Sequence, residues 1–478
     1  MSVSRQPRPL SSGLVGPLVG GIAFAIVVGL LGAAGRSWAA PLMAAAVFVL
    51  GAYYVRVLGN QVGLVALLIV TSVVDHFTFS VGSLALRPEQ VAALVALVFV
   101  AVVRLRARDA SWLKPALWEI LLLAWFVIGI VSSLLDSPDK RLSAKILALI
   151  AICSLGLFLP RRLLAGQRAA EQMEVVTRLL LLVFATEAAY GTFAYLLHVF
   201  GPTIGLTPNP ASGHLSAYGT LWEQNVFGAF AAAGAVAWVY LGPARFKRAA
   251  IGLGVCVGGL FDSLTRAAWL AAGVVGLIGL AMPNLRRRIN YRVIALAGLI
   301  GAGVVVATLV VDRVGRYNVQ VSRGPGGGAP PGFLTAILNV VDIAGRANQV
   351  GPVFHDLSGH LVLGGGIAGY EARHVVQGVP QHVASLPLLV LNDTGLIGLL
   401  VFGAFAAALV LRVWSVRSNP IVLGLGQAGI VVGLTNLSTE TTELMIGWLL
   451  IGLLLAACDA ASAGPLETPA ADSRAGPI

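Results

Sequence analysis

The histidines of this chain are gathered on one side of its apolar segments. All seven lie in or at the ends of segments that we assign to the same face of a membrane, together with several carboxylates and arginines. Histidine titrates near neutral pH and can accept a proton from a hydroxyl group, so such a face suits acid–base chemistry on a polar substrate. The residues concerned are His76, His198, His214, His355, His360, His374 and His382, with Glu223, Asp262, Arg266, Asp312, Arg346, Asp356 and Asp393.

Two arginines on this face are candidate ligands of an anion. Arg266 stands in a short turn between two apolar segments, where a charge is costly unless it is paired or faces water. Either it pairs with Asp262, four residues earlier, or its guanidinium group binds an anion such as phosphate. Arg346 is a second candidate of the same kind, and its alternative is a place on the solvated face of a helix.

A polar cluster of Trp222, Glu223 and Asn225 stands where a long outer segment re-enters the apolar region. The Glu and Asn side chains either cap the helix that follows or bind sugar hydroxyl groups, with Trp222 as a stacking surface. The sequence leaves both interpretations open.

The elements that must position these residues are membrane helices. Of the 478 residues, 57% are hydrophobic and only 11% are charged. A soluble domain has roughly 25% charged residues, so this much apolar surface must face lipid. The formal charge of +11 comes from short basic clusters between apolar runs, without interleaved aromatic residues. This pattern indicates cytoplasmic loops rather than a nucleic-acid-binding surface.

The expected fold is an all-α polytopic transmembrane helical bundle of about 12–14 spans. Some segments, such as 61–75, are short, which is typical of interfacial or re-entrant helices. The candidate spans are 13–33, 38–56, 61–75, 88–104, 115–135, 142–160, 175–199, 223–242, 247–263, 266–281, 291–311, 385–411, 420–437 and 443–458.

The loops complete the predicted organisation. We expect a cytoplasmic N-terminus (1–12), transmembrane helices (13–311) with an outer loop at about 200–222, a large periplasmic or extracellular loop (312–384), further transmembrane helices (385–458) and a disordered cytoplasmic tail (459–478). Apolar periodicity predicts an amphipathic helix over 333–358 within the large loop. Loops of this length tend to carry function.

Four stretches together resemble motifs of the O-antigen ligase/polymerase superfamily of polytopic membrane glycosyltransferases. They are Gly219-Thr followed by Asn225 and Gly228, Ser263-Leu-Thr-Arg-Ala-Ala-Trp269, Gly345-Arg346 followed by Gly359-His-Leu-Val-Leu-Gly-Gly-Gly366, and His382 followed by Asp393-Thr-Gly395. The resemblance covers about residues 200–411. The family's His-Asn pair would fall on Ala384-Ser385, so His382 is displaced by two residues from the family's histidine position.

The resemblance implies transfer of a glycan from a polyprenyl-diphosphate carrier to a hydroxyl group of a glycolipid or glycan acceptor, outside the bacterial cytoplasmic (inner) membrane. Such a reaction builds envelope polysaccharides such as lipopolysaccharide or exopolysaccharide, and no cofactor or metal is expected. By this resemblance Arg266 and Arg346 hold the diphosphate, and His382 is the base, with His360 or Asp393 as alternatives. Substrate binding would involve these residues together with Trp222, Glu223 and Asn225.

Two other functions compete with this one. A secondary transporter or flippase of envelope lipids or glycans would place ionisable groups near the middle of the membrane on broken helices, and here only Glu187 is central in its span. An inactive scaffold within an envelope-assembly complex is the third possibility. No nucleotide-binding motif supports nucleotide-driven transport, and the sequence does not choose between ligase and polymerase.

Overall fold

The computed structural model describes most of the chain after residue 38. The described residues are 39–74, 78–81, 84–108, 114–200, 205–208, 215–221, 223–242, 246–323, 351–376, 379–383, 385–439 and 441–463. The predictions for the N-terminus, for the span 13–33 and for most of the tail lie outside them.

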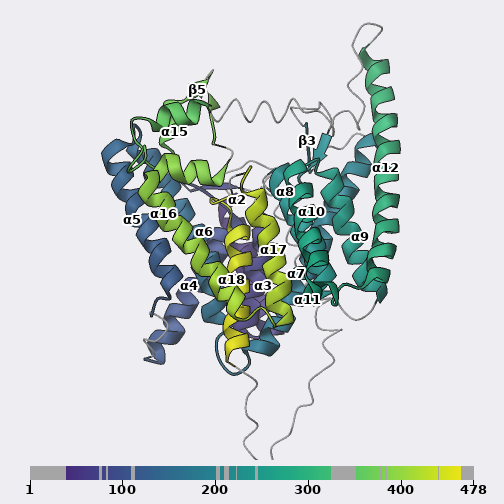
Figure 1. Ribbon diagram of the computed structural model, residues 1–478, viewed down its shortest axis with the longest axis horizontal. Helices are drawn as coiled ribbons and strands as arrows, with labels where there is room; N and C mark the ends of the chain where they lie inside the picture. Colours follow the sequence, from purple (N-terminus) through teal and green to yellow (C-terminus); the bar gives the residue numbers. More distant parts are fainter. Residues whose placement is uncertain are drawn as a thin grey trace, which may run out of the picture.

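Helices make up nearly all of the described chain, as expected for an all-α protein (Figure 1). They are α2 (Ala39–Leu58), α3 (Asn60–Ser72), α4 (Pro88–Arg106), α5 (Leu117–Asp136), α6 (Lys140–Leu163), α7 (Ala169–Leu197), η2 (His198–Phe200), α8 (Gln224–Leu241), α9 (Phe246–Asp262), α10 (Arg266–Ala281), α11 (Pro283–Arg286), α12 (Tyr291–Arg323), α15 (Gly369–Arg373), α16 (Leu386–Ser415), α17 (Pro420–Thr435) and α18 (Met445–Ser462). Three antiparallel hairpins pair β1 (Phe79–Val81) with β2 (Leu84–Leu86), β3 (Leu206–Pro208) with β4 (Leu215–Ala217), and β5 (Val375–Val376) with β6 (Val379–Pro380).

The helices form a polytopic membrane bundle. Within the described residues, eight helices are long and apolar enough to cross a membrane, and four shorter helices are also apolar. Each predicted span from 38–56 onward coincides with a helix. Large apolar side chains such as Leu123, Leu277 and Leu400 are exposed on the surface, where lipid would cover them.

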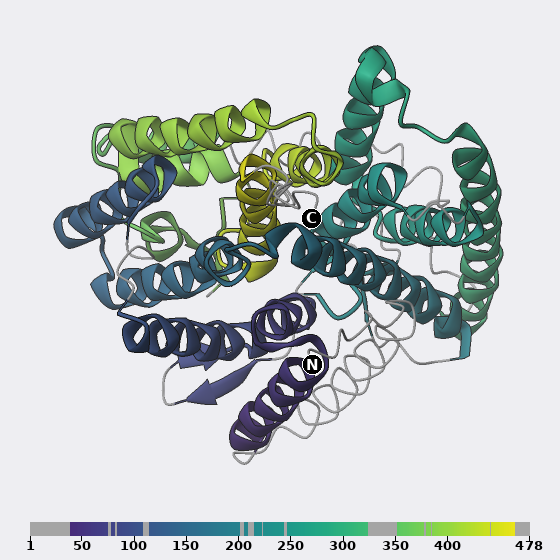
Figure 2. The same cartoon turned by 90° about the horizontal axis from the view of Figure 1, so that it is seen from below.

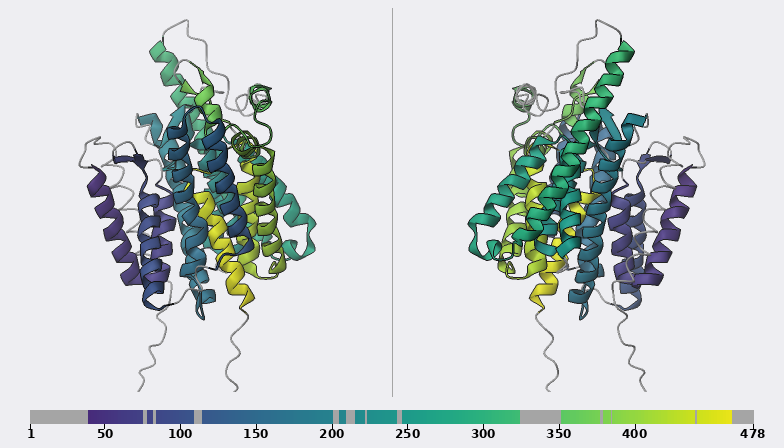
Figure 3. Two further views of the ribbon diagram at one scale, coloured as in Figure 1. Left: turned by 90° about the vertical axis from the view of Figure 1, so that its left-hand side faces the viewer. Right: turned by 90° about the vertical axis from the view of Figure 1, so that its right-hand side faces the viewer.

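The two ends of the bundle differ in character. The β-hairpins and α15 lie at one end, which we call the hairpin end (Figures 1 and 3). The opposite end, which we call the basic end, carries arginines at the ends of α4, α6 and α11, among them Arg106, Arg162 and Arg286. The helices connect the two ends in alternating directions.

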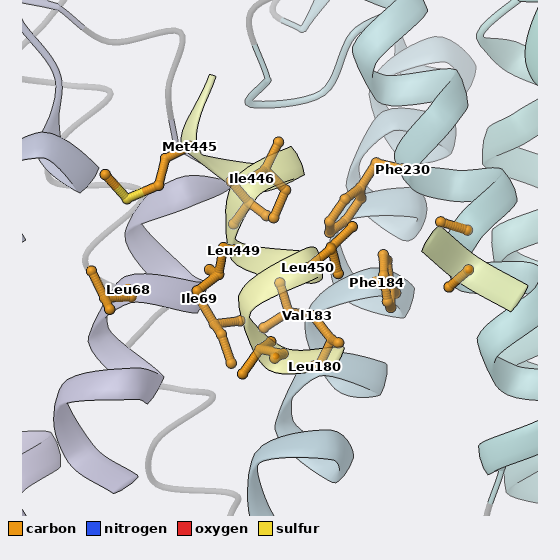
Figure 4. Packing of buried hydrophobic residues seen from close by; sticks show 14 of the residues in the cluster. Leu68, Ile69, Leu180, Val183, Phe184, Phe230, Met445, Ile446, Leu449 and Leu450 are labelled. Carbon is orange, nitrogen blue, oxygen red and sulfur yellow. The ribbon is translucent and has the colours of Figure 1, made fainter. Parts of the chain in front are cut away.

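The helix α18 lies near the centre of the bundle (Figure 2), where it contacts α3, α6, α7, α16 and α17. Leu449 and Leu450 of α18 lie between Ile69 of α3 on one side and Phe184 of α7 and Phe230 of α8 on the other, in one continuous apolar core (Figure 4). The helix is apolar on nearly every face, because it has protein neighbours all round.

The short helix α3 is a core element. With 13 residues it is about 20 Å long, too short to cross a bilayer by itself. Of the two expectations for such a short segment, an interfacial position is wrong here, since its residues from Val62 to Ser72 are buried, whereas burial within the protein is compatible with a re-entrant segment. It contacts α2, α4, α6, α7 and α18, so it lines the interior rather than the lipid boundary.

The loop predicted to begin at residue 312 begins later. The helix α12 continues through Asp312 to Arg323 and extends beyond its neighbours at the hairpin end (Figure 1). Charged residues end an apolar run but not a helix, because the backbone hydrogen bonds continue into water. Of the amphipathic helix predicted over 333–358, residues 351–357 are helical, and 333–350 lie outside the described residues.

At the basic end, arginines that the sequence suggested only as markers of orientation have specific partners. Glu119 of α5 is 1% exposed, and its Oε1 lies 2.5 Å from Arg162 Nη1 and 3.4 Å from Arg161 Nη1. Arg161 also pairs with Asp459 of α18, which lies 2.8 Å from Arg412 of α16. This network ties four helices together.

At the hairpin end, α16 is broken at Gly395, which has a positive φ of 65°. The backbone amide and carbonyl groups that lose their helical partners at the break form hydrogen bonds with the loop before α15. Gly365 N donates to Asn392 O at 2.7 Å and Gly366 N to Asp393 O at 3.1 Å, while Leu396 N donates to Leu361 O at 2.8 Å. The glycine run 364–366 therefore completes the broken helix.

Gly395→Ala should destabilise the protein by about 2 kcal/mol or more, because a Cβ atom would lie 2.3 Å from Val362 O and alanine disfavours a positive φ. The measurement is thermal unfolding in detergent, followed by size-exclusion chromatography. Gly403→Ala, in the same helix with nothing within 4 Å of the added Cβ, is the matched control. Equal stability of the two variants would contradict the proposed role of the break.

Candidate functional site

A cavity of about 320 Å³ lies at the hairpin end, between segments far apart in the sequence. Its walls come from the starts of α4 and α8, from α6 and α15, from the first part of α16 and from the connection between α17 and α18. The described lining residues are Arg87, Ile146, Ile150, Glu223, Asn225, Val226, Ala368, Glu371, His382, Val383, Leu389, Asp393, Ser438, Thr439, Thr442, Glu443 and Leu444.

The predicted base, His382, is on this cavity and is held by a carboxylate. Its Nδ1 lies 2.5 Å from Glu371 Oε1. The His382 side chain is 71% exposed and that of Glu371 only 16%. The half-buried carboxylate thus orients an accessible imidazole, an arrangement found in many acid–base pairs.

The polar residues at the start of α8 line the same cavity. Glu223 occupies the N-cap position but makes no side-chain capping bond. Asn225 Nδ2 donates to Glu223 Oε1 at 3.3 Å. Within the described residues the Glu223 side chain therefore does not cap α8, and Glu223 and Asn225 line the cavity instead. Trp222 lies outside the described residues.

The carboxylate of Glu187, which the sequence placed at the centre of its span, accepts hydrogen bonds from the turn before α8. Its Oε1 accepts a hydrogen bond from Thr220 N at 2.6 Å, and its Oε2 accepts one from Thr220 Oγ1 at 2.8 Å. Gly219 has a φ of 64°, and a Cβ there would lie 2.0 Å from Glu187 Oε1. The carboxylate thus fixes the Gly-Thr turn that leads into α8.

Asp393 reaches the cavity because it stands immediately before the break in α16. It is 4% exposed, and its carbonyl oxygen accepts hydrogen bonds from Gly366 N and, at 2.8 Å, from Ser132 Oγ of α5. The position of this carboxylate therefore depends on the glycine run 364–366.

The loop that carries Glu371 is fastened by a buried ion pair. Asp356, 7% exposed, receives hydrogen bonds from Arg373 at 2.6 and 2.8 Å, from Asn392 at 3.0 Å and from His374 at 3.1 Å. Burial alone would raise the pKa of the Asp356 carboxyl, but these hydrogen bonds outweigh it and hold the pKa well below its usual range. Arg373 also donates to Gly365 O at 3.1 Å, which joins α15 to the glycine run.

Arg266 begins α10, beside the start of α8. Thr265 Oγ1 donates to Gln224 O at 2.9 Å, so Arg266 is one residue from a contact with the Glu223–Asn225 segment. It does not line the described cavity. The predicted pairing with Asp262 is absent from the described residues, since the Asp262 carboxylate accepts from Thr308 Oγ1 at 2.8 Å instead.

The structure separates His360 from the cavity. His360 Nδ1 lies 3.9 Å from Asp136 Oδ1 at the end of α5, and His360 is not among the cavity residues. Arg346 lies outside the described residues. Among the described residues, no group of three or more His, Cys, Asp or Glu side chains is arranged to hold a metal ion.

Two comparisons with known proteins found no match. No protein-family model matches it, and no curated protein matches it. The O-antigen ligase/polymerase family is therefore a resemblance carried by the four motifs alone.

Sequence reasoning missed three charged residues of the cavity, Arg87, Glu371 and Glu443. Arg87 is 8% exposed, and its Nη1 donates to Glu443 O at 2.8 Å. One signal was available: residues 438–443, Ser-Thr-Glu-Thr-Thr-Glu, form a dense polar run between two apolar spans. The other was Arg87 itself, a basic residue directly before the span 88–104 at its outer end.

Asp356→Asn should lower stability by about 2 kcal/mol at neutral pH, because Arg373 loses its charged partner. Since the pKa of Asp356 is lowered in the folded protein, its stabilising effect is present at neutral pH and is lost as the pH falls below about 4. The difference in melting temperature between wild type and variant should therefore shrink below that pH. Glu174→Gln, which breaks the exposed Arg178–Glu174 pair, is the control and should have little effect. A difference independent of pH would contradict the assignment.

Proposed function

We propose that this protein is a membrane glycosyltransferase of the O-antigen ligase/polymerase type. It would transfer a glycan from a polyprenyl-diphosphate carrier to an acceptor hydroxyl group at the hairpin end. The carrying observation is that residues of two motifs far apart in the sequence line one cavity; they are Glu223 and Asn225 of the first motif and His382 and Asp393 of the fourth. The basic end would face the cytoplasm by the positive-inside rule, which puts the cavity on the periplasmic or extracellular side of the bacterial cytoplasmic membrane.

The pair of His382 and Glu371 supports the chemistry. With Nδ1 directed at Glu371, Nε2 of His382 would take the proton from the acceptor hydroxyl group. The hydroxyl oxygen would then form a bond to the anomeric carbon while the bond from that carbon to the diphosphate breaks. The diphosphate leaves with the electron pair, so the step needs no general acid.

The departing diphosphate requires positive charge. Arg266, next to the Thr265–Gln224 contact, and Arg346 are the arginines that the resemblance assigns to it. Guanidinium groups suit this role because they remain charged and donate two parallel hydrogen bonds to phosphate. Arg87 is the arginine among the described residues of the cavity itself.

The broken helix α16 is the observation that favours a transporter, because transporters often bind solutes at such breaks. In this protein the main released groups have partners: the carbonyls of Asn392 and Asp393 accept from Gly365 and Gly366. The break therefore does not present these carbonyls to a solute. It serves to position Asp393 on the cavity, which favours the enzyme.

His382→Ala should lower kcat by a factor of roughly 10² to 10⁴, the usual contribution of a general base. Glu371→Gln should lower kcat with little change in KM, because it orients the imidazole without touching the substrate. The assay uses purified protein in detergent with an undecaprenyl-diphosphate oligosaccharide and glycolipid or glycan acceptors. His360→Ala is the control and should retain activity. Loss of activity in His360→Ala with retention in His382→Ala would assign the base to His360.

Arg266→Ala and Arg346→Ala should each lower consumption of the same donor by about 10² or more, since each removes a charge that meets the leaving group. Arg178→Ala, an exposed arginine of α7 in an exposed ion pair, should leave the rate unchanged. Full activity in both Arg266→Ala and Arg346→Ala would refute the diphosphate role. Passage of the labelled glycolipid across proteoliposomes without bond transfer would establish the transporter instead.

A further inference from the structure

Two connections at the basic end, opposite the candidate site, bring exposed arginines together. The first runs through α11 to the start of α12, and the second joins α16 to α17 (Figure 1). Arg288 Nη2 donates to Ser418 O at 3.2 Å, so the two connections are in contact. We call their exposed arginines the arginine surface; they are Arg286, Arg287, Arg288, Arg292 and Arg417.

The positive charge of this surface is not compensated by carboxylates. The sequence has no Asp or Glu between Asp262 and Asp312, and none between Asp393 and Glu440. Within the described part of the chain, none of the five arginines forms an ion pair. Asp459 lies at the same end of the bundle, but Arg161 and Arg412 pair with it. Five guanidinium groups therefore remain for an anion from outside the protein.

Both connections are ordered turns rather than free chain. Asn290 Oδ1 accepts a hydrogen bond from Arg292 N at 3.1 Å, and Asn419 Oδ1 accepts one from Ile421 N at 2.9 Å. The Arg417 guanidinium lies 4.3 Å from the centre of the Trp414 ring, and its Nη1 donates to Trp414 O at 2.8 Å. The arginines are thus held close to one another before any ligand arrives, which lowers the entropic cost of binding.

The arginine surface borders the part of the protein that faces lipid. Leu280 at the end of α10 and Leu411 near the end of α16 are large apolar side chains exposed on the surface. Tyr291 and Trp414 are exposed beside the arginines, and aromatic residues of this kind are enriched at the level of lipid headgroups. An anion that carries acyl chains can therefore use both the charged and the apolar side chains.

We infer that the arginine surface binds the headgroup of an anionic membrane phospholipid, and that cardiolipin, with two phosphate groups, fits it best. Guanidinium groups donate paired hydrogen bonds to phosphate oxygens and keep their charge. Basic surfaces between membrane helices are typical binding sites for such headgroups. This interaction goes beyond the proposed function and does not depend on it, because it lies at the opposite end of the bundle.

Orientation of the protein in the membrane is a weaker explanation of this surface. The positive-inside rule requires only that basic residues be present in each cytoplasmic loop. It does not require that two loops be joined through Arg288 and Ser418, or that an arginine stack on an exposed tryptophan. These contacts concentrate the charge of two loops on one surface, which is what a divalent headgroup needs.

The test is native mass spectrometry of the purified full-length protein in a neutral detergent, titrated with tetraoleoyl cardiolipin or with dioleoyl phosphatidylcholine. Each basic residue near a lipid headgroup contributes about fivefold in affinity. The variant Arg286→Gln/Arg287→Gln/Arg292→Gln should therefore bind cardiolipin about 100-fold more weakly than wild type and should bind phosphatidylcholine equally well. These three side chains are exposed, so an unchanged melting temperature should show that the variant is folded.

The matched control removes the same number of charges elsewhere at the basic end. Arg56 in the last turn of α2, Arg106 at the end of α4 and Arg108 directly after it are also exposed. The main neighbours of these two helices include α3 and α6, and α4 lies well apart from α11 (Figure 1). The variant Arg56→Gln/Arg106→Gln/Arg108→Gln should bind cardiolipin within about threefold of wild type, because distant exposed charges are largely screened.

Three results would overturn the inference. They are equal loss of cardiolipin binding in both triple variants, equal affinity of wild type for the two lipids, and unchanged binding in the Arg286→Gln/Arg287→Gln/Arg292→Gln variant. A further arm adds inorganic phosphate or chloride at equal ionic strength during the cardiolipin titration. The two salts should weaken binding equally, whereas stronger competition by phosphate would reassign the surface to a soluble phosphate compound.

Discussion

The hydrogen bonds between the glycine run 364–366 and the break in α16 are the contact on which the hairpin end depends. A helix that stops within a bundle leaves carbonyl and amide groups that apolar surroundings cannot satisfy. The loop supplies those partners from its own backbone, and Ser132 of α5 bonds both Asp393 O and Gly364 O. Because loop and helix complete each other, α15 and Asp393 are held in place around the same cavity.

The molecule uses buried carboxylates in two different ways. Glu119 at the basic end and Asp356 at the hairpin end each lie against arginines and have their oxygens occupied, so they join elements. Such pairs hold only while both partners are present, because an unpartnered buried charge is costly. The carboxylates of the cavity also have partners, such as His382 for Glu371 and Asn225 for Glu223, but they line a space large enough for part of a sugar. Their position on this space separates the candidate site from the framework.

The distribution of polar groups also bears on the rival functions. Glu187, the ionisable residue nearest the centre of a predicted span, is used by the Thr220 turn, and the broken helix is closed by backbone hydrogen bonds. The cavity lies at one end of the bundle instead, where a lipid-linked donor and a water-borne or lipid-borne acceptor can meet. This arrangement agrees better with a group transfer at the membrane surface than with passage through its middle.

The sequence by itself determined the class of fold and the positions of the helices, because an apolar run of about 20 residues has one stable form in lipid. It also identified His382, Glu223, Asn225 and Asp393, since polar residues at the ends of apolar runs are conspicuous. Only the tertiary structure decided which of them meet. The pairing of His382 with Glu371, the contribution of Arg87 and the separation of His360 from the cavity arise from contacts between distant segments. The break at Gly395 was likewise hidden, because its partner is a loop about thirty residues earlier and no local pattern records that contact.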